Sequence, residues 1–415
     1  MFRISQYMHE LTTLQSGKPH QPAASESNAG ARNGPRGPVV IWNLIRRCNL
    51  TCKHCYSISA DIDFPGELET EQIKDVMKDL RQFGVPVLIL SGGEPLLRPD
   101  IFELSHYAKS LGFYVGLSTN GTLIDENHIA PIADVAYDYV GISIDGMRET
   151  HDAFRQKQGA FDASMNAIRL CHEAGIKVGM RFTPTQHNAD ELPQLLRVMD
   201  EEGVDKLYVS HLNYGGRGNR NRRSDVVHQA SRKIMDLLFE TAWNDAQNGG
   251  SREYVTGNND ADGVYLLHWI EKHLPQHYEH MRKRLSLWGG NSSGVNIANI
   301  DNLGNVHPDT FWWNYNLGNV KDRAFSDIWP DTSDPLMAGL KSKPRPLKGR
   351  CRVCSYQDVC GGNTRVRAFQ TTGDPWWEDP ACYLDDAELG VSEKDYINDK
   401  PVPMALKIRK IRRAS

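Results

Sequence analysis

Residues 48–56 read CNLTCKHCY, three cysteines spaced C-x3-C-x2-C and followed by an aromatic ring. Cys48, Cys52 and Cys55, the N-terminal cysteine group, offer three thiolates, whereas structural zinc takes four protein ligands. The one further donor at finger-like spacing, His54, lies between two of the cysteines. A 4Fe–4S cluster bound by three thiolates would leave one iron open to a further ligand. The stretch therefore predicts a metal centre, with an iron–sulfur cluster favoured and zinc as the alternative.

The cysteines directly follow the first of six short apolar segments that alternate with amphipathic helical patterns. The segments are VVIWNLI at 39, VPVLIL at 85, FYVGLS at 113, YVGISI at 139, IKVGMRF at 176 and KLYVS at 206. Strand followed by helix, repeated six times, is typical of a parallel sheet with right-handed crossovers. Six units are too few for a closed barrel of eight. We therefore predict an α/β fold with a partial (β/α)6 TIM-type barrel.

Changes in composition predict five parts of the chain. Residues 14–38 are rich in Gly, Pro, Ser and Asn and lack apolar periodicity, which indicates a flexible leader. KIRKIRR at 407–413 is basic, as expected of a solvated end. The predicted parts are a flexible leader (1–38), the partial barrel (39–222), a helical connection (223–290), a cysteine-rich domain (291–390) and a basic tail (391–415).

Charge and cysteine usage narrow the classes of function. A net charge of −4 gives no support to a nucleic-acid or membrane-surface role. No apolar run approaches the roughly 18 residues of a membrane span, and no secretory signal is visible, so we expect a cytoplasmic protein. Eight cysteines are too few for a disulfide scaffold in 415 residues. Seven of them are clustered, which favours metal binding in a reducing compartment; Cys171 alone is expected to be a small buried residue.

Three further strands end in glycines or small polar residues. LILSGGEP at 88–95 has two glycines that would let its backbone approach a ligand closely. LSTNGT at 117–122 and GISIDG at 141–146 place small polar side chains at two more strand ends. Each could also be a turn that satisfies its own backbone. The carboxyl ends of parallel strands form one edge, so these residues are expected to share a site with the cysteines.

Taken in order, CNLTCKHCY, GGEP and the polar strand ends resemble the radical S-adenosylmethionine (SAM) enzymes. The resemblance implies that the open iron of the cluster binds SAM. It implies SAM-binding roles for Tyr56, Gly92, Gly93, Glu94, Pro95, Ser118, Asn120, Ser143 and Asp145. Arg155 and Arg181 could clamp a carboxylate, or each could be a surface or interstrand charge.

A second group of cysteines, the C-terminal cysteine group, comprises Cys351, Cys354, Cys360 and Cys382. Their spacing, after NIDNLGNVHPD at 299–309, resembles the SPASM or twitch extension of radical SAM enzymes, which binds auxiliary clusters. His307 and Thr364 stand where the full pattern of seven cysteines would supply two more. The four that remain imply one auxiliary 4Fe–4S cluster with complete cysteine ligation, and therefore two clusters in all. A zinc ribbon is the alternative, because C-x2-C alone does not select its metal.

Over residues 39–390 the resemblance is closest to the branch of these enzymes that modifies tetrapyrroles on the path to heme d1. It implies that a 5′-deoxyadenosyl radical removes propionate side chains from a siroheme-derived tetrapyrrole, 12,18-didecarboxysiroheme, with flavodoxin or ferredoxin as reductant. Alternatives are a related siroheme decarboxylase or heme synthase, and a peptide-maturing SPASM enzyme. A non-catalytic iron–sulfur scaffold is disfavoured because it would not need GGEP. The sequence identifies no general acid or base.

A flat macrocycle with several carboxylates needs aromatic surface and cations together. Trp312 and Trp313 are candidates for stacking, although core packing is the simpler interpretation. The candidates for carboxylate binding are Arg217, Arg220, Arg222 and Arg223, with an exposed basic loop as the alternative. Four histidines at helical spacing could bind a heme-like iron, but their charged neighbours favour a solvated face; they are His268, His273, His277 and His280.

Overall fold

The computed structural model describes residues 1–16 and 37–404. Its centre is an 11-stranded sheet with the order β1-β8-β7-β6-β5-β4-β3-β2-β9-β10-β11. Six consecutive strands are mutually parallel and match the six predicted segments. They are β2 (Val39–Asn43), β3 (Val87–Ser91), β4 (Tyr114–Thr119), β5 (Tyr139–Ser143), β6 (Val178–Phe182) and β7 (Lys206–Ser210). The predicted α/β partial barrel is therefore confirmed.

The parallel array is two strands longer than predicted. β8 (Glu253–Gly257) pairs parallel with β7, and β9 (Ile297–Ile300) pairs parallel with β2. β8 lies in the stretch predicted to be a helical connection, and β9 in the predicted second domain. Eight parallel strands do not make a closed barrel here, because β8 pairs onward with β1 and β9 pairs onward with β10.

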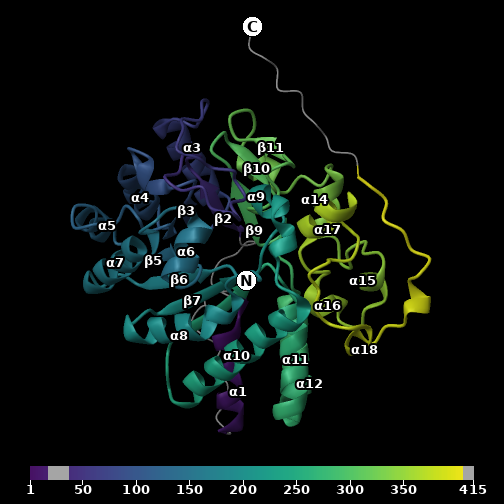
Figure 1. Ribbon diagram of the computed structural model, residues 1–415. Helices are drawn as coiled ribbons and strands as arrows, with labels where there is room; N and C mark the ends of the chain where they lie inside the picture. Colours follow the sequence, from purple (N-terminus) through teal and green to yellow (C-terminus); the bar gives the residue numbers. More distant parts are fainter. Residues whose placement is uncertain (17–36, 405–415) are drawn as a thin grey trace.

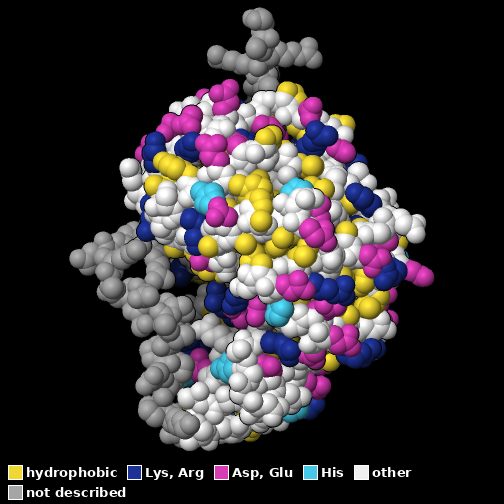
Figure 2. Space-filling model, turned by 90° about the vertical axis from the view of Figure 1, so that its left-hand side faces the viewer, with side chains coloured by type: hydrophobic (Ala, Val, Ile, Leu, Met, Phe, Trp, Pro, Cys, Tyr) yellow, Lys and Arg dark blue, Asp and Glu magenta, His cyan; other side chains and the backbone are white. Residues whose placement is uncertain are grey.

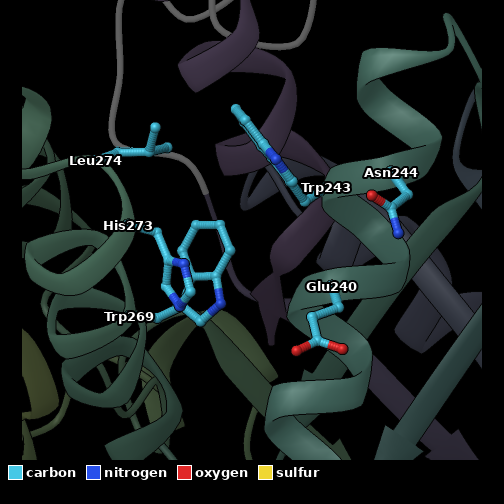
Figure 3. A pocket seen from close by; sticks show the side chains of 6 residues that line it. All are labelled: Glu240, Trp243, Asn244, Trp269, His273 and Leu274. Atoms are coloured by element: carbon cyan, nitrogen blue, oxygen red, sulfur yellow. The ribbon is translucent and has the colours of Figure 1, made fainter.

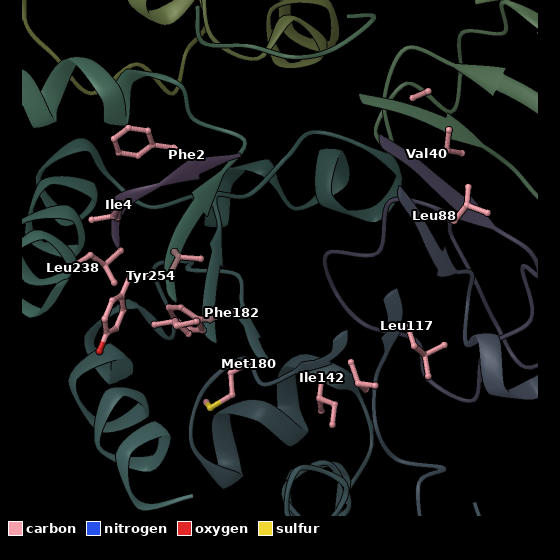
Figure 4. Packing of buried hydrophobic residues seen from close by; sticks show 14 of the residues in the cluster. Phe2, Ile4, Val40, Leu88, Leu117, Ile142, Met180, Phe182, Leu238 and Tyr254 are labelled. Atoms are coloured by element: carbon pink, nitrogen blue, oxygen red, sulfur yellow. The ribbon is translucent and has the colours of Figure 1, made fainter. Parts of the chain in front are cut away.

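Helices between the parallel strands cover one face of the sheet (Figure 1). Alternate side chains of the strands, among them Leu88, Leu117, Ile142 and Phe182, are buried against them (Figure 4). This face carries intermixed acidic and basic side chains on its outside (Figure 2). The helices are α3 (Thr70–Gln82), α4 (Ile101–Ser110), α5 (Ile129–Val135), α6 (Arg148–Arg155), α7 (Ala160–Glu173) and α8 (Leu192–Glu201).

The predicted flexible leader is wrong for its first part. β1 (Phe2–Arg3) pairs antiparallel with β8, and α1 (Ile4–Gln15) packs beside α10. Phe2 and Ile4 are buried close to Leu238 and Tyr254 (Figure 4). The physical reason is the apolar spacing of α1, which makes one helix face hydrophobic. Residues 17–36, the rest of the predicted leader, lie outside the described residues.

After β7 the chain forms three long helices and the short α9 (Gly216–Arg220). The long helices are α10 (His228–Gln247), α11 (Ala261–His273) and α12 (Tyr278–Trp288). The predicted hairpin follows as β9 and β10 (Asn305–His307), with His307 opposite Asn299, and β11 (Gly318–Asn319) completes the sheet. None of the described helices combines the length and apolarity needed to cross a membrane.

The cysteine-rich region is a lobe of short helices beside α11 and α12 (Figure 1). Its helices are α14 (Pro335–Lys341), α15 (Arg350–Val353), α16 (Gln357–Cys360), α17 (Arg365–Thr372) and α18 (Asp386–Leu389), whereas α13 (Phe325–Ile328) packs against α3. In the predicted basic tail, residues 405–415, which include KIRKIRR, lie outside the described part.

Candidate functional site

The N-terminal cysteine group lies on a loop that follows β2 at the carboxyl edge of the sheet. Backbone hydrogen bonds tie this loop to three distant segments: among them, Glu94 N donates to Arg47 O at 2.9 Å, Lys53 N to Phe154 O at 3.1 Å, and Arg217 N to Cys55 O at 2.9 Å. The cluster loop, residues 44–60, is therefore held by the turn after β3, by α6 and by α9 together.

The thiols of this group are packed with Leu50 in a small cluster of their own, separate from the main core. Cys48 and Cys52 are buried, and burial raises the pKa of both thiols. A buried thiolate is therefore unfavourable unless a cation lies close to it, and a bound metal ion supplies such a charge.

Arg155 and Asp145 form a buried ion pair behind Cys52. Arg155 Nη1 donates to the Cys52 sulfur at 3.5 Å, and Nη2 pairs with Asp145, whose side chain is fully buried. The second oxygen of Asp145 accepts a hydrogen bond from Thr183 N at 2.8 Å. In this structure both side chains are thus engaged with the protein, so their predicted role on SAM remains a prediction while their role in supporting Cys52 is visible.

GGEP packs directly on the cluster loop. A Cβ added at Gly92 would lie 2.6 Å from the Ile45 carbonyl oxygen, and one added at Gly93 would lie 2.2 Å from that of Arg47. Gly93 N also donates to Ile45 O at 2.6 Å. Gly92 and Gly93 are therefore required because the backbone of the cluster loop lies against them. This reason differs from the predicted one, the close approach of a ligand.

The carboxylate of Glu94 joins the ends of two strands. It accepts hydrogen bonds from Thr119 Oγ1 at 2.7 Å and from Asn120 N at 2.8 Å. Burial raises the pKa of Glu94 to about 7, although these hydrogen bonds act to lower it. Asn120 in turn donates to Asn49 Oδ1 at 2.9 Å, within the cluster loop. The predicted residues Glu94 and Asn120 thus belong to one network, in which Pro95 begins a short 3-10 helix.

Three other predicted residues face one another inside the curved sheet. Arg181 donates to Ser118 Oγ, lies beside Ser143 in the strand register, and stacks over the Tyr208 ring at 5.5 Å. Deeper in the sheet, Tyr139 fills the space left by Gly179, where an added Cβ would meet the tyrosine oxygen at 2.2 Å. Ser118, Ser143 and Arg181 therefore line the interior of the curved sheet, which we call the lumen. The ring of Tyr139 fills the lumen nearer the amino ends of the strands.

Tyr56 connects the cluster loop with the segment that follows the hairpin. Its hydroxyl accepts a hydrogen bond from Asn43 Nδ2 at 2.7 Å. Its ring meets Phe311 and Trp313 edge-on, with centroids 5.4 and 6.0 Å apart. Arg46 lies 5.8 Å from the centre of the Trp313 ring. We call Arg46, Tyr56, Phe311 and Trp313 the aromatic rim.

The two neighbouring tryptophans have different environments. Trp312 is fully buried and packs on Tyr315 and Phe369, as the core interpretation predicts. Trp313 is half-buried in the aromatic rim and stacks parallel to His307 at 6.2 Å. His307 itself bonds Tyr315 O and Asp301 through its two ring nitrogens. Only Trp313 of this pair is therefore available to a ligand.

The four candidate arginines do not form one clamp. Arg217 donates to Cys52 O at 2.7 Å and to Ser59 O at 2.9 Å, so it holds the cluster loop. Arg220, Arg222 and Arg223 are exposed. The tight packing of Gly216, whose added Cβ would lie 2.3 Å from Tyr56 O, explains this arrangement because it brings the GGRG segment onto the loop. The prediction of a shared carboxylate site is wrong for Arg217.

The four histidines of α11 and α12 are dispersed. His273 and His280 are exposed, and His280 pairs with Glu10 at 2.6 Å. His273 lines an open hollow between α10 and α11, with Trp269, Trp243 and Glu240 (Figure 3). This hollow lies on the outside of the molecule, away from the cluster loop. The predicted solvated face therefore holds for His273 and His280, whereas His277 is partly buried and His268 is partly buried with its ring against that of Tyr356.

Each thiol of the C-terminal cysteine group is free of disulfides and only partly accessible. Burial raises the pKa of Cys354 to about 11 and that of Cys382 to about 12, and the charge of Cys351 contributes to both shifts. Thr364, where the full motif would have a further cysteine, donates instead to Asn258 O at 3.0 Å.

Across residues 1–16 and 37–404, no three His, Cys, Asp or Glu side chains are arranged to hold one metal ion. In a 4Fe–4S cluster each thiolate binds its own iron, so the sulfurs need not converge on one point. Both groups of thiols fit such a cluster in chemistry, because they are soft ligands, are buried or partly buried, and lie close to guanidinium groups.

Comparison with known proteins agrees with this geometry. Residues 42–210 match the radical SAM superfamily model. The chain is 52% identical, over 94% of both proteins, to a "Pre-heme d1 synthase" of Dinoroseobacter shibae. The chain belongs to the radical SAM superfamily, which implies a 4Fe–4S cluster and SAM as cofactors.

Within that superfamily the chain is also 44% identical to an "Fe-coproporphyrin III synthase" of Methanosarcina barkeri, over 86% of this chain and 90% of the relative. Its fold is similar to that of Streptococcus suis SuiB, with a TM-score of 0.64 and 17% identity over 84% of this chain and 78% of SuiB. At that identity the likeness concerns the fold alone.

Several residues of the site were missed by the sequence analysis. Asn43 lies in the first apolar segment and Arg46 directly after it, but the sequence assigns neither residue a role in the site. Phe311 precedes the two candidate tryptophans, and Gly216 lies in the run YGGRGN at 214–219, in which the sequence assigns a role to Arg217 alone. The glycines of that run were the available signal, because closely spaced glycines after a strand indicate close backbone approach.

Proposed function

We propose that this enzyme removes propionate side chains from a siroheme-derived, iron-containing tetrapyrrole, 12,18-didecarboxysiroheme, on the path to heme d1. The observation that carries the proposal is the 52% identity to a Pre-heme d1 synthase over 94% of both chains. Two relatives named for heme precursors, at 52% and 44% identity, support a tetrapyrrole as the substrate class.

The aromatic rim supports the same substrate class. A flat macrocycle gains from stacking on aromatic side chains, and its carboxylates gain from a guanidinium nearby. Trp313 and Phe311 supply the aromatic surface, and Arg46 supplies a cation beside it. These residues take the place of the tryptophan pair and the arginine loop considered from the sequence.

The cofactors in this proposal are two 4Fe–4S clusters and SAM. The N-terminal cysteine group holds the first cluster, and the C-terminal cysteine group holds the auxiliary cluster. The residues proposed to bind SAM are Tyr56, Gly92, Gly93, Glu94, Pro95, Ser118, Asn120, Ser143, Asp145, Arg155 and Arg181. When bound, the first cluster and SAM supply a carbon-centred radical that removes hydrogen from an unactivated C–H bond.

The protein's own side chains hold the substrate in place and shield its reacting carbon from water. Tyr139 closes the base of the lumen and the aromatic rim lines its mouth, so a reactive carbon can be kept away from water. The seven clustered thiols must stay reduced to bind iron, which suits the cytoplasm and a flavodoxin or ferredoxin as electron donor.

A test is to incubate the reduced enzyme, SAM and 12,18-didecarboxysiroheme without oxygen and to analyse the macrocycle by mass spectrometry. Loss of whole propionate side chains is expected, and an alanine variant of the N-terminal cysteine group serves as the inactive control. Loss of carbon dioxide alone would favour the related decarboxylase or heme synthase. An unchanged macrocycle, together with modification of a precursor peptide, would favour a peptide-maturing enzyme and contradict the proposal.

A further inference from the structure

Two arginines, Arg365 fully buried and Arg345 partly buried, lie beside the C-terminal cysteine group without a carboxylate partner. Arg365 is fully buried, and its guanidinium donates only to backbone oxygens, of Asn363 at 3.2 Å, Pro375 at 3.1 Å and Trp377 at 2.5 Å. Its Nη2 has no hydrogen-bond partner among the described residues. A fully buried cation with one unpaired nitrogen is costly unless an anion is close to it.

Arg345 is the second of these arginines. It donates to the carbonyl oxygen of Gly361, the residue after Cys360, at 3.0 Å, and to Asn291 O at 2.9 Å. Burial, and after it the charge of Arg365, lower the pKa of Arg345 to about 10. The two guanidinium groups therefore lie close enough to repel each other.

Neighbouring arginines show that this lobe does provide carboxylates elsewhere. Arg367, two residues beyond Arg365 on α17, is equally buried and pairs with Asp379 at 2.9 Å. Arg350 pairs with Asp386 at 3.3 Å. Among the described residues, neither Arg345 nor Arg365 has such an ion pair. The missing counter-charge is specific to the two arginines.

The cysteines are the natural source of that charge. Arg365 Nε donates to the carbonyl oxygen of Asn363, three residues after Cys360, and Arg345 donates to that of Gly361, so both guanidinium groups lie against the segment that follows this cysteine. Two charges act to raise the pKa of Arg345, that of Asp260 first and that of Cys360 after it. The carboxylate of Asp260 also accepts a hydrogen bond from Asn291 Nδ2 at 3.2 Å. Thiolates held on a metal centre would thus face both guanidinium groups.

We propose that Arg345 and Arg365 are the counter-charges of the auxiliary 4Fe–4S cluster and hold its reduction potential high enough for it to accept an electron. This rests on the proposed binding of that cluster by the C-terminal cysteine group. A cluster with four thiolates is anionic and gains one more negative charge when it takes up an electron. Nearby cations therefore stabilise the reduced form more than the oxidised form, which raises the potential.

The auxiliary cluster can be studied alone in a chain whose N-terminal cysteine group is replaced by alanine. In that background, Arg365→Met and Arg345→Met are titrated with dithionite and followed by electron paramagnetic resonance. Each is expected to lower the potential so that the ratio of reduced to oxidised cluster at a fixed potential falls about tenfold, about 59 mV for one electron. Arg365→Lys, which keeps the charge, is expected to shift the potential less than Arg365→Met.

Arg352→Met is the matched control. Arg352 stands between Cys351 and Cys354 in sequence, but it is exposed and paired with Asp399 at 2.8 Å, so its loss should leave the potential unchanged. The proposal is overturned if Arg345→Met and Arg365→Met shift the potential no more than this control, or if the site holds zinc and gives no redox signal.

Should Arg365→Met fail to bind iron, Arg345→Met and Arg365→Lys decide the question by the same measurement. The titration contains no substrate, so it is independent of the proposed reaction. A shifted potential with an unreactive tetrapyrrole would uphold this inference and reject the substrate.

Discussion

Replacing Gly93 by alanine tests whether the contact between GGEP and the cluster loop is required for chemistry. The new Cβ would lie 2.2 Å from the Arg47 carbonyl oxygen and 2.4 Å from that of Arg46. Favourable contacts of carbon lie at about 3.5–4.0 Å, so the loop would have to retreat by about 1 Å or more. Both obstacles are backbone atoms, which cannot rotate away as a flexible side chain could.

Two consequences follow for Gly93→Ala, one for stability and one for rate. Overpacking of this kind costs about 1–3 kcal/mol of unfolding free energy. A displacement of about 1 Å at a reacting centre costs about 100-fold in rate. The rate of 5′-deoxyadenosine formation by the reduced enzyme, measured beside chemical unfolding of the same preparation, separates the two.

The control for Gly93→Ala is Gly159→Ala at the start of α7. Gly159 has a φ of 79° and nothing within 4 Å of an added Cβ. A non-glycine residue in this conformation costs about 1–3 kcal/mol, so the control should lose similar stability without losing rate. SAM cleavage at the wild-type rate by Gly93→Ala, or an equal loss of rate in both variants, would refute the reasoning.

Further expectations concern iron content, acid stability and the tryptophan pair. Anaerobically reconstituted protein should hold about eight irons. After alanine replacement of the N-terminal cysteine group, about four irons should remain and SAM cleavage should be lost. Metal analysis that finds zinc in the C-terminal cysteine group would contradict this. Burial alone would raise the pKa of Glu253, but the ion pairs with Lys177 and Lys206 lower it to about 2. The folded-state pKa is thus below the unfolded one, so this stabilisation is present above about pH 4.5 and is lost as pH falls toward 2. Because Glu253 is partly exposed, Glu253→Gln should lower the free energy of unfolding in urea by only about 1–2 kcal/mol at pH 7, and by progressively less below pH 4.5. A difference between the variant and the wild type that does not depend on pH would argue against the ion pair. Trp313→Ala should weaken tetrapyrrole binding by about tenfold while SAM cleavage persists, whereas Trp312→Ala should lower the unfolding free energy by about 3–5 kcal/mol; equal effects on binding would remove the aromatic rim from the substrate site.

The barrel strands could be predicted because their chemistry is local. Each of the six predicted strands is a short apolar run that a helical pattern separates from the next, and all but β6 end in Asn, Ser or Thr. β8 was hidden because its five residues, EYVTG, follow a long helical pattern and contain one glycine and one charge. α1 did carry a signal, since Ile4, Met8 and Leu11 recur at helical spacing. That signal was lost beside the Gly- and Pro-rich stretch that follows it.

The site was predictable in its residue types but less so in their partners. A spacing of cysteines identifies possible metal ligands, because ligand chemistry depends on the residue itself. The partner of an arginine depends on which distant segments meet. Arg217 and Arg155 were read as binding groups for carboxylates, yet Arg217 holds the cluster loop and Arg155 pairs with Asp145 beneath Cys52. Only the three-dimensional arrangement supplies that information.

The backbone ties on the cluster loop bear on how the protein is assembled in the cell. The loop is hydrogen-bonded to Phe154, more than a hundred residues further along the chain, and to Arg217, more than a hundred and fifty residues further along. Contacts of such long sequence separation form only after the intervening strands have folded. A chain still emerging from the ribosome has no fixed geometry for its first three cysteines until β7 and the glycine run have been made. We therefore expect the first cluster to be assembled on an already folded barrel.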